Sequence, residues 1–95
     1  MKTSEPPSFH VYILLCSDGS LYTGIAKDVD RRVALHTQGR GARYTRSRGV
    51  LALVYREGPY GHGDALRRER FIKTLSRKAK EQLIGSYGLG KTHKV

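Results

Sequence analysis

The sequence predicts an α+β fold in which a three-stranded antiparallel sheet is flanked by helices, in the order β-β-α-β-α-α. Two short apolar runs lie on either side of the turn Ser17-Asp18-Gly19, which predicts a hairpin over about 10–25. A third run, rich in β-branched and aromatic residues, predicts a strand over 50–56. Apolar residues spaced by three and four, each group preceded by a polar capping residue, predict helices over 28–38, 64–75 and 76–84.

The 95 residues suffice for one domain with a single modest core, which we place over 9–85. Residues 1–8 are expected to form a disordered leader and residues 86–95 a basic flexible tail. The lone Cys16 cannot form an intrachain disulfide and is predicted to be buried in its apolar strand. The first apolar run has about six residues, whereas a membrane-spanning helix needs ~20, so a soluble, cytoplasmic protein is expected.

Charge indicates the class of partner. Lys and Arg total 18 against 8 acidic residues, which gives a formal net charge of +10. A field of that sign attracts polyanions, so nucleic acid is the expected partner and a membrane is not. A ribosome-associated protein or a merely soluble basic protein would carry the same charge, and the charge says nothing about catalysis.

The register of the hairpin decides whether its two tyrosines can act together. A two-residue Asp18-Gly19 loop would pair Leu15 with Tyr22 and place Tyr12 and Tyr22 on opposite faces of the sheet. A three-residue loop, with a left-handed glycine in a bulge, would pair Tyr12 with Gly24 and place both tyrosines on one face. A joint active site requires the second register, which we therefore predict.

The first helix presents two rows of side chains to the sheet. Asp28 is its predicted N-cap, and Val29 and Val33 mark its buried stripe at a spacing of four. Arg32 and His36 repeat that spacing on the neighbouring row, so they are expected to border the stripe rather than face open water.

Residues 39–49 are predicted to be a loop rich in glycine and arginine. The loop holds a basic patch with one interleaved aromatic residue: Arg40, Arg43, Tyr44, Arg46 and Arg48. Such a patch can neutralise several phosphates and offer one stacking surface, so we predict that it contacts nucleic acid. A mobile, solvated loop is the structural alternative. Nothing in the patch supplies base readout, so no sequence specificity is predicted.

A carboxylate on the second helix is unexpectedly placed. After a loop over 58–63, Asp64 is predicted to cap this helix, and Ser76 to cap the last one. Glu69 lies on or beside the stripe that includes Ile72 and should pack inward, so it needs a cation or hydrogen-bond donors as partner. A salt bridge to Arg32 or to a neighbouring lysine is the structural alternative to a metal site.

Together these residues resemble the GIY-YIG nuclease superfamily. The two tyrosines stand in the tripeptides His10-Val11-Tyr12 and Tyr22-Thr23-Gly24, where His10 replaces the first glycine of the family pattern. Arg32 follows Tyr22 by ten residues, and the segment Arg68–Lys73 is similar to the acid-bearing segment of small, single-domain bacterial members. The resemblance covers about 9–85 and implies the same three-stranded sheet flanked by helices, in a bacterial, nucleoid-associated protein.

The resemblance implies a divalent-metal-dependent endonuclease that hydrolyses DNA phosphodiester bonds. Glu69 would bind one Mg²⁺ or Mn²⁺, an ion that suits one carboxylate together with waters and substrate phosphate. Tyr22 would act as general base or position the attacking water, with Tyr12 assisting, although a phenol with a pKa of about 10 needs a nearby cation for that role. Arg32 would stabilise the charge that develops on phosphorus.

Further residues receive supporting roles. His36 would donate to phosphate or relay a proton, with a purely structural histidine as the alternative. Gly24 would allow close approach of the backbone, and Lys73 would contact a phosphate.

The family analogy also suggests structure-directed cleavage in DNA repair or recombination, and a protein partner that supplies specificity. The rival hypothesis is a non-catalytic or partner-dependent nucleic-acid binding module; an RNA-associated or ribosome-associated protein would leave the Tyr, Arg and Glu pattern unexplained.

Two other patterns are rejected. Residues 85–92 satisfy the P-loop pattern GxxxxGKT, but this motif works only between a strand and a helix, and here a predicted helix precedes it. The four histidines lack the spacing of a zinc site.

Overall fold

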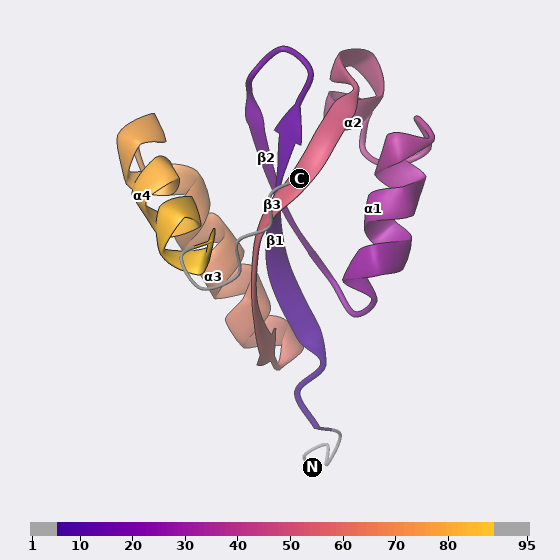
Figure 1. The fold of residues 1–95 in the computed structure, drawn as a ribbon. Helices are drawn as coiled ribbons and strands as arrows, with labels where there is room; N and C mark the ends of the chain where they lie inside the picture. The colour runs from indigo at the N-terminus through magenta and orange to yellow at the C-terminus, as the bar shows by residue number, and fades with distance from the viewer. Residues whose placement is uncertain (1–5, 89–95) are drawn as a thin grey trace.

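A three-stranded antiparallel sheet with the strand order β2-β1-β3 forms the centre of the computed structural model, which describes residues 6–88 (Figure 1). The predicted fold class is confirmed. The elements, in chain order, are β1 Phe9–Cys16, β2 Leu21–Ala26, α1 Val29–Thr37, α2 Arg43–Arg48, β3 Val50–Tyr60, α3 His62–Thr74 and α4 Arg77–Gly88.

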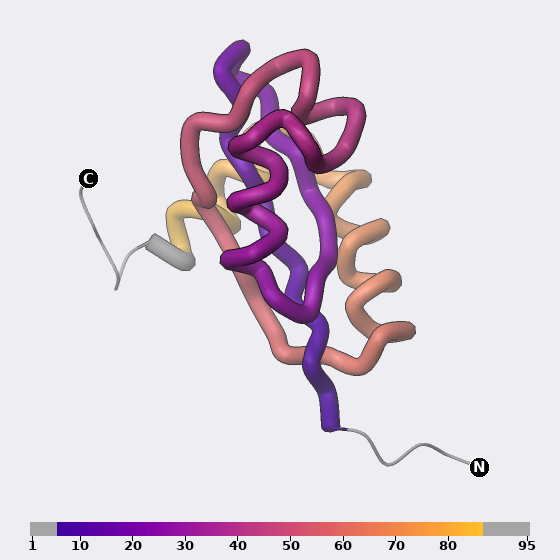
Figure 2. Tube along the Cα trace, turned by 90° about the vertical axis from the view of Figure 1, so that its right-hand side faces the viewer, coloured from indigo at the N-terminus to yellow at the C-terminus, as the bar shows by residue number. Residues whose placement is uncertain are grey.

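The central strand β1 is covered on both faces, which divides the core in two. Successive side chains of a strand point to opposite faces. Val11 and Ile13 therefore pack with Ile72 of α3, whereas Tyr12 and Leu14 pack with Val29 of α1 on the other face. Figure 1 shows α3 and α4 on one side of the sheet and α1 and α2 on the other, and Figure 2 looks onto the face that α1 covers.

The hairpin adopts the register that a joint active site requires. Leu14 pairs with Tyr22 and Tyr12 pairs with Gly24, so both tyrosines lie on the face that α1 covers. Gly19 makes this loop possible because its φ of 87° lies in the left-handed region that favours glycine. The prediction of a three-residue loop is confirmed, as is the burial of the cysteine that ends β1.

The prediction of a loop over 39–49 was wrong, because α2 occupies residues 43–48. The amide of Arg46 donates to Ala42 O at 3.0 Å, and Gly49, with a φ of 80°, ends the helix. A helix of six residues is unstable alone, so contacts outside it must hold it. Those contacts are made by Thr45 and Arg48 and are described with the site below. A sequence window that sees only local composition therefore misses this helix.

The third strand is longer than the prediction of 50–56 and takes up the first part of the predicted loop over 58–63. It runs to Tyr60, which pairs with Phe9 at the start of β1. The register shifts between these two strands, and Gly58 has a φ of 127°, which accommodates an irregular strand. Pairing with β1 thus extends the strand past a glycine and a proline that suggest a turn.

The ends of the last two helices correct one predicted cap and confirm another. Gly61, rather than Asp64, is the N-cap of α3, and Asp64 lies in its first turn, where a carboxylate favours the helix dipole. Ser76 caps α4 as predicted, because its Oγ accepts a hydrogen bond from the amide of Ala79 at 3.1 Å. The last helix continues past the predicted end at residue 84, to Gly88.

The described part of the P-loop pattern, residues 85–88, does not have the structure that this motif requires. Residues 85–88 continue α4, so the pattern starts inside a helix rather than after a strand. Residues 1–5 of the predicted leader and residues 89–95 of the predicted tail lie outside the described part of the chain. Within 6–88, no helix is long and apolar enough to cross a membrane.

A largely buried carboxylate attaches β3 to α3. Glu57 accepts hydrogen bonds from the hydroxyls of Tyr55 and Tyr60, the latter at 2.7 Å, and from Nη2 of Arg68 at 3.1 Å. Burial alone would raise the pKa of Glu57, but the hydrogen bonds from Arg68 and the two tyrosines hold that pKa below its ordinary value. Because Arg68 adjoins Glu69, this contact also fixes the part of α3 that carries the predicted metal-binding acid.

Candidate active site

The hydroxyl of Tyr12 is in direct contact with another predicted catalytic residue, His36. The side chain is 1% exposed, and its Oη lies 3.0 Å from Nε2 of His36 on α1. Across the hairpin, Gly24 leaves room for this hydroxyl, because a β-carbon at that position would lie 2.7 Å from it. The glycine of the second tripeptide is therefore required sterically, by the tyrosine of the first.

Three other predicted residues are close enough to influence the pKa of the same hydroxyl. Burial raises the pKa of Tyr12 to about 12, and the nearby Tyr22 and Glu69 contribute to that increase. Hydrogen bonding and positive charge from Arg32 oppose it. Residues from β1, β2, α1 and α3 are thus close enough to influence one oxygen, although they are spread over 58 positions of the sequence, from 12 to 69.

His36 is held in a buried and polar setting. Its Nδ1 lies 2.7 Å from Oγ1 of Thr45, and both side chains are almost fully buried, at 1% and 0% exposed. Gly41 makes space for the ring, because a β-carbon there would overlap Nδ1. Burial, and then the charge of Arg32, lower the pKa of His36 below its ordinary value, so the imidazole is neutral at pH 7.

Tyr22 lies at the centre of an aromatic group on the same face. Its ring centroid is 5.1 Å from that of His36, 5.8 Å from that of Tyr44 and 6.3 Å from that of Tyr12. Such tilted pairs at these distances are favourable arrangements of aromatic rings. The ring of Tyr22 is only half-buried, which leaves this tyrosine accessible from solvent at the edge strand β2.

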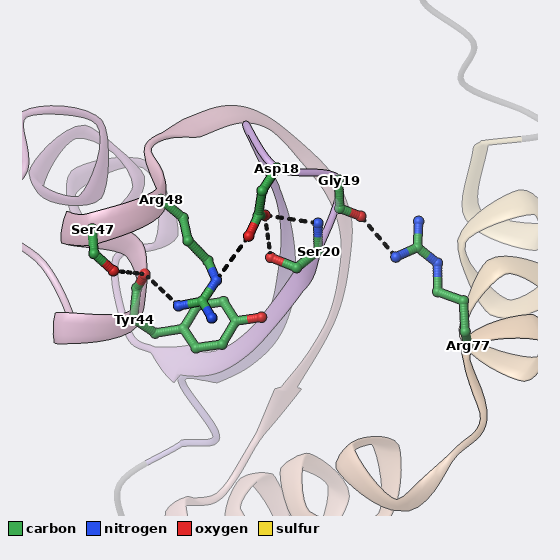
Figure 3. A network of polar contacts seen from close by, with 7 residues as sticks. All are labelled: Asp18, Gly19, Ser20, Tyr44, Ser47, Arg48 and Arg77. Atoms are coloured by element: carbon green, nitrogen blue, oxygen red, sulfur yellow. Dashed lines mark hydrogen bonds and ion pairs between the residues drawn. The ribbon is translucent and has the colours of Figure 1, made fainter.

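A polar network anchors α2 to the hairpin loop (Figure 3). The guanidinium of Arg48 lies 3.8 Å from the ring centroid of Tyr44 and forms an ion pair with Asp18, Nε to Oδ2, at 3.0 Å. On the other side of the loop, Arg77 of α4 donates to Gly19 O at 2.7 Å. The loop between the two tyrosine-bearing strands is therefore held by a helix on each side.

In the predicted basic patch, one arginine is held by contacts within the protein and three are exposed to solvent. Arg48 covers one face of Tyr44, so the two form a structural pair around the hairpin loop. Arg40, Arg43 and Arg46 are exposed and make no ion pair with any other residue that the structure describes. Their contact with nucleic acid stays a prediction.

Glu69 faces the interior side of α3, as the pattern indicates, and has a lysine partner. Its side chain is 17% exposed and pairs with Nζ of Lys73 at 3.0 Å, whereas Lys73 is 52% exposed. The structural alternative of a salt bridge to a neighbouring lysine is thus present in the geometry. The described residues contain no group of three or more His, Cys, Asp or Glu that could hold a metal ion.

This donor set still fits a magnesium-type ion. Mg²⁺ keeps several of its waters and is bound through one or two carboxylates together with substrate phosphates. Glu69 supplies one such carboxylate, close enough to Tyr12 to influence its pKa. Lys73 is the more exposed partner and lies on a flexible stem, so it can move aside without breaking the fold.

A positively charged cavity of about 400 Å³ opens beside Arg32. Its walls come from the end of β2 and the start of α1: Ile25, Ala26, Lys27, Asp28, Arg31, Arg32 and Leu35. The one carboxylate among them, Asp28, already accepts a hydrogen bond from the amide of Arg31 at 3.0 Å. The cavity therefore offers three cationic side chains on the arginine side of the site.

Sequence reasoning missed Thr45 and Gly41, which hold His36, and Lys27 and Arg31, which line the cavity. The local sequence does not indicate the roles of Thr45 and Gly41, because these residues contact His36 only once α1 and α2 have packed together. A glycine at position 41 and a threonine four residues later look like ordinary loop residues. The charges of the second pair are visible in the sequence close to Arg32, but the helical spacing indicates only that Arg31 faces solvent and does not indicate a cavity.

Comparison with known proteins agrees with this geometry. Residues 8–82 match the family model of the GIY-YIG catalytic domain. A UPF0213 protein of Staphylococcus aureus strain Mu3 is 53% identical over 77 residues, which cover 81% of this chain and 94% of the relative. The solution NMR structure of a UPF0213 protein of Bacillus halodurans is similar with a TM-score of 0.56 and 48% identity, covering 86% of this chain and 87% of that one. That of a protein of E. faecalis is similar with a TM-score of 0.58 and 35% identity, covering 100% and 99% of the two chains.

Proposed function

This chain belongs to the GIY-YIG family of catalytic domains, and from that premise we propose that it is a divalent-metal-dependent endonuclease that hydrolyses DNA phosphodiester bonds. One observation carries the proposal. The buried Tyr12 lies at the centre of the site: its hydroxyl is 3.0 Å from Nε2 of His36, and its ring centroid is 6.3 Å from that of Tyr22. Arg32 on α1 and Glu69 on α3 are close enough to influence its pKa. A hydroxyl, a guanidinium and a carboxylate around one point are the groups that phosphodiester hydrolysis uses.

The two tyrosines take different roles in this proposal. With a pKa raised to about 12, Tyr12 keeps its proton at neutral pH and acts as a hydrogen-bonding group that holds the site together. Tyr22 is more exposed and lies at the edge of the sheet, where a substrate phosphate and its attacking water can approach. We therefore assign to Tyr22 the positioning and deprotonation of water.

Arg32 binds and stabilises the reacting phosphate. Its planar guanidinium can donate two parallel hydrogen bonds to phosphate oxygens, and the charge that builds on them in the transition state strengthens those bonds. A divalent cation at Glu69, Mg²⁺ or Mn²⁺, would supply Lewis-acid stabilisation of the same charge. Lys73, displaced from Glu69, would then be free to contact a phosphate.

The cations beside Arg32 are proposed to hold the phosphate that neighbours the reacting one. Lys27 and Arg31 line the cavity that Arg32 also lines, and Arg31 makes no ion pair within residues 6–88. Arg40, Arg43 and Arg46, which follow α1 or lie on α2, are further exposed cations. Structure-directed cleavage, a role in DNA repair or recombination and a protein partner for specificity are parts of the proposal that rest on family analogy alone.

The experiment is cleavage of plasmid, single-stranded and branched DNA by the wild-type protein with Mg²⁺, Mn²⁺ or EDTA. Cleavage of at least one substrate that requires a divalent ion is the expected result. The same substrates, labelled and titrated in EDTA, report binding by fluorescence anisotropy. Binding to all three forms without cutting under any metal condition would contradict the proposed catalysis.

One observation favours the second candidate, a nucleic-acid binding module without turnover. The ion pair between Glu69 and Lys73 neutralises the carboxylate that a metal ion would need. If the protein is such a module, Lys73→Met should still bind DNA but should cut none of the substrates at any Mg²⁺ concentration. Under the nuclease proposal, Lys73→Met lowers the Mg²⁺ concentration that gives half-maximal cleavage, because the cation competitor is gone.

A further inference from the structure

A continuous chain of hydrogen bonds leads from the active site into α2. Oη of Tyr12 lies 3.0 Å from Nε2 of His36, and Nδ1 of the same ring lies 2.7 Å from Oγ1 of Thr45. The threonine hydroxyl then lies 3.0 Å from the carbonyl oxygen of Ala42. Tyr12, His36 and Thr45 are all at most 1% exposed, so water does not compete for these bonds.

The last bond of the chain sets the direction of all the others. A carbonyl oxygen only accepts, so Thr45 must donate its single proton to Ala42. Its oxygen is then an acceptor toward Nδ1 of His36, which places a proton on Nδ1. A neutral imidazole carries one proton, so Nε2 is bare and accepts the proton of Tyr12.

We propose that Thr45 is a positioning residue, which fixes His36 in the tautomer with a proton on Nδ1 and thereby directs the hydroxyl proton of Tyr12 away from the substrate. The lone pairs of Tyr12 are then available to accept a hydrogen bond, and Arg32 is close enough to lower the pKa of this hydroxyl. The helix α2, absent from the sequence prediction, is the part of the fold that delivers this threonine. The effect on cleavage rests on the proposed nuclease function, whereas the tautomer of His36 does not.

Gly41 supports the same arrangement from a second direction. A β-carbon at Gly41 would overlap Nδ1 and approach the rest of the imidazole, so the chain before α2 is shaped to the ring. The residues from Gly41 to Thr45 thus surround one side of His36, with space from the glycine and an acceptor from the threonine. A buried histidine in a purely structural role needs only a hydrogen-bond partner of either kind. His36 has a partner, Thr45, that can only accept, because its proton is used in the bond to Ala42.

The tautomer can be measured directly by ¹H–¹⁵N NMR of the histidine side chains in the wild-type protein at pH 7.5. The protonated and bare ring nitrogens have well-separated ¹⁵N shifts. The expected result for His36 is a protonated Nδ1 and a bare Nε2. A protonated Nε2, or a doubly protonated ring, would overturn the proposal whether or not the protein cleaves DNA.

Variants test the role of the hydroxyl. Thr45→Val keeps the shape but removes the acceptor, so His36 should populate the other tautomer, and single-turnover cleavage should fall roughly 10- to 100-fold, the range found for partners that orient a histidine. Thr45→Ser keeps the hydroxyl and should restore both properties. Wild-type tautomer and rate in Thr45→Val, or failure of Thr45→Ser to restore them, would contradict the proposal.

Thr74 provides a matched control. Its Oγ1 donates to Phe71 O at 2.7 Å, the same local bond to the third preceding carbonyl that Thr45 makes, but Thr74 is exposed. Thr74→Val should leave the His36 shifts and the cleavage rate at wild-type values. An equal loss in both variants would show a general effect of removing a helix hydroxyl and would overturn the specific role of Thr45.

Discussion

Gly24 on β2 is paired with Tyr12 on the neighbouring strand β1, and a β-carbon at Gly24 would lie 2.7 Å from the tyrosine hydroxyl. The second glycine of the family pattern and the first tyrosine are therefore one structural unit. This relationship explains why a small change on β2 should disturb a residue on β1.

Gly24→Ala is expected to displace Tyr12 and to break its contact with His36. Overpacking of a buried site costs about 1–3 kcal/mol, and the cleavage rate should fall with the loss of geometry. Thermal unfolding and single-turnover cleavage measure the two effects. Gly63→Ala is the control. A β-carbon at this position in α3 would lie 3.8 Å from its nearest neighbour, and alanine has a higher helix propensity than glycine, so neither stability nor cleavage should fall. Equal behaviour of the two variants would contradict the steric account.

Removal of the two tyrosine hydroxyls should give different results. Tyr12→Phe leaves Nε2 of the buried His36 without its partner, so the free energy of unfolding should fall by about 1–3 kcal/mol. Tyr22→Phe keeps the aromatic contacts and should change stability little, while the cleavage rate falls about 100-fold or more. Chemical denaturation and single-turnover kinetics separate the two effects. Wild-type cleavage by Tyr22→Phe would remove this residue from the proposed chemistry.

Arg31→Ala should weaken DNA binding in a salt-dependent manner. The Asp28 cap uses the backbone amide of residue 31, so the helix start is retained in this variant. If Arg31 contacts one phosphate, the slope of log K against log salt should become shallower by about 1. Anisotropy titrations in EDTA at several salt concentrations measure this slope. Lys78→Ala is the matched control, because Lys78 is an exposed charge on α4, on the opposite side of the sheet from the cavity. An identical salt slope in the two variants would argue against the cavity as a phosphate site.

Acidification should weaken the attachment of α3 through Glu57. The pKa of Glu57 is held below its ordinary value in the folded protein, so its stabilising effect is present above the unfolded pKa of about 4.3 and is lost as pH falls through the folded pKa. At pH 7, Glu57→Gln should be less stable by about 2 kcal/mol, because bonds to a charged group are lost. The difference between the two proteins should shrink between pH 5 and about 3. Thermal unfolding across that range measures it, and a constant difference would contradict the assignment.

The sequence was informative where chemistry constrains geometry locally. Asp18-Gly19 suggested a hairpin, and the need for two tyrosines on one face selected the register that the structure shows. The spacing of Arg32 and His36 predicted that both border the buried stripe of α1 rather than face open water; this is confirmed for His36, which is buried, and wrong for Arg32, which is exposed. In each case neighbours in the sequence determine the outcome.

The sequence was uninformative where contacts between residues far apart in the chain determine whether a helix or strand forms and where it ends. The helix α2 depends on Arg48 binding Asp18 and on Thr45 binding His36, and neither pair is visible in a local window. The extension of β3 likewise depends on the pairing of Tyr60 with Phe9. The role of Glu69 could be suggested from the resemblance, but its ion pair with Lys73 and its influence on Tyr12 required the fold.

The most direct test of the central claim is single-turnover cleavage by Glu69→Gln at saturating DNA and Mg²⁺, on whichever substrate the wild-type protein cuts best. The variant keeps the shape of the side chain, and an ion pair of this partly exposed kind contributes at most about 1 kcal/mol, so the fold should persist. We predict that cleavage falls by about 100-fold or more while DNA affinity in EDTA is equal or higher. Cleavage within a few-fold of the wild-type rate would contradict the role of Glu69 as the metal-binding acid and, with it, the proposed active site.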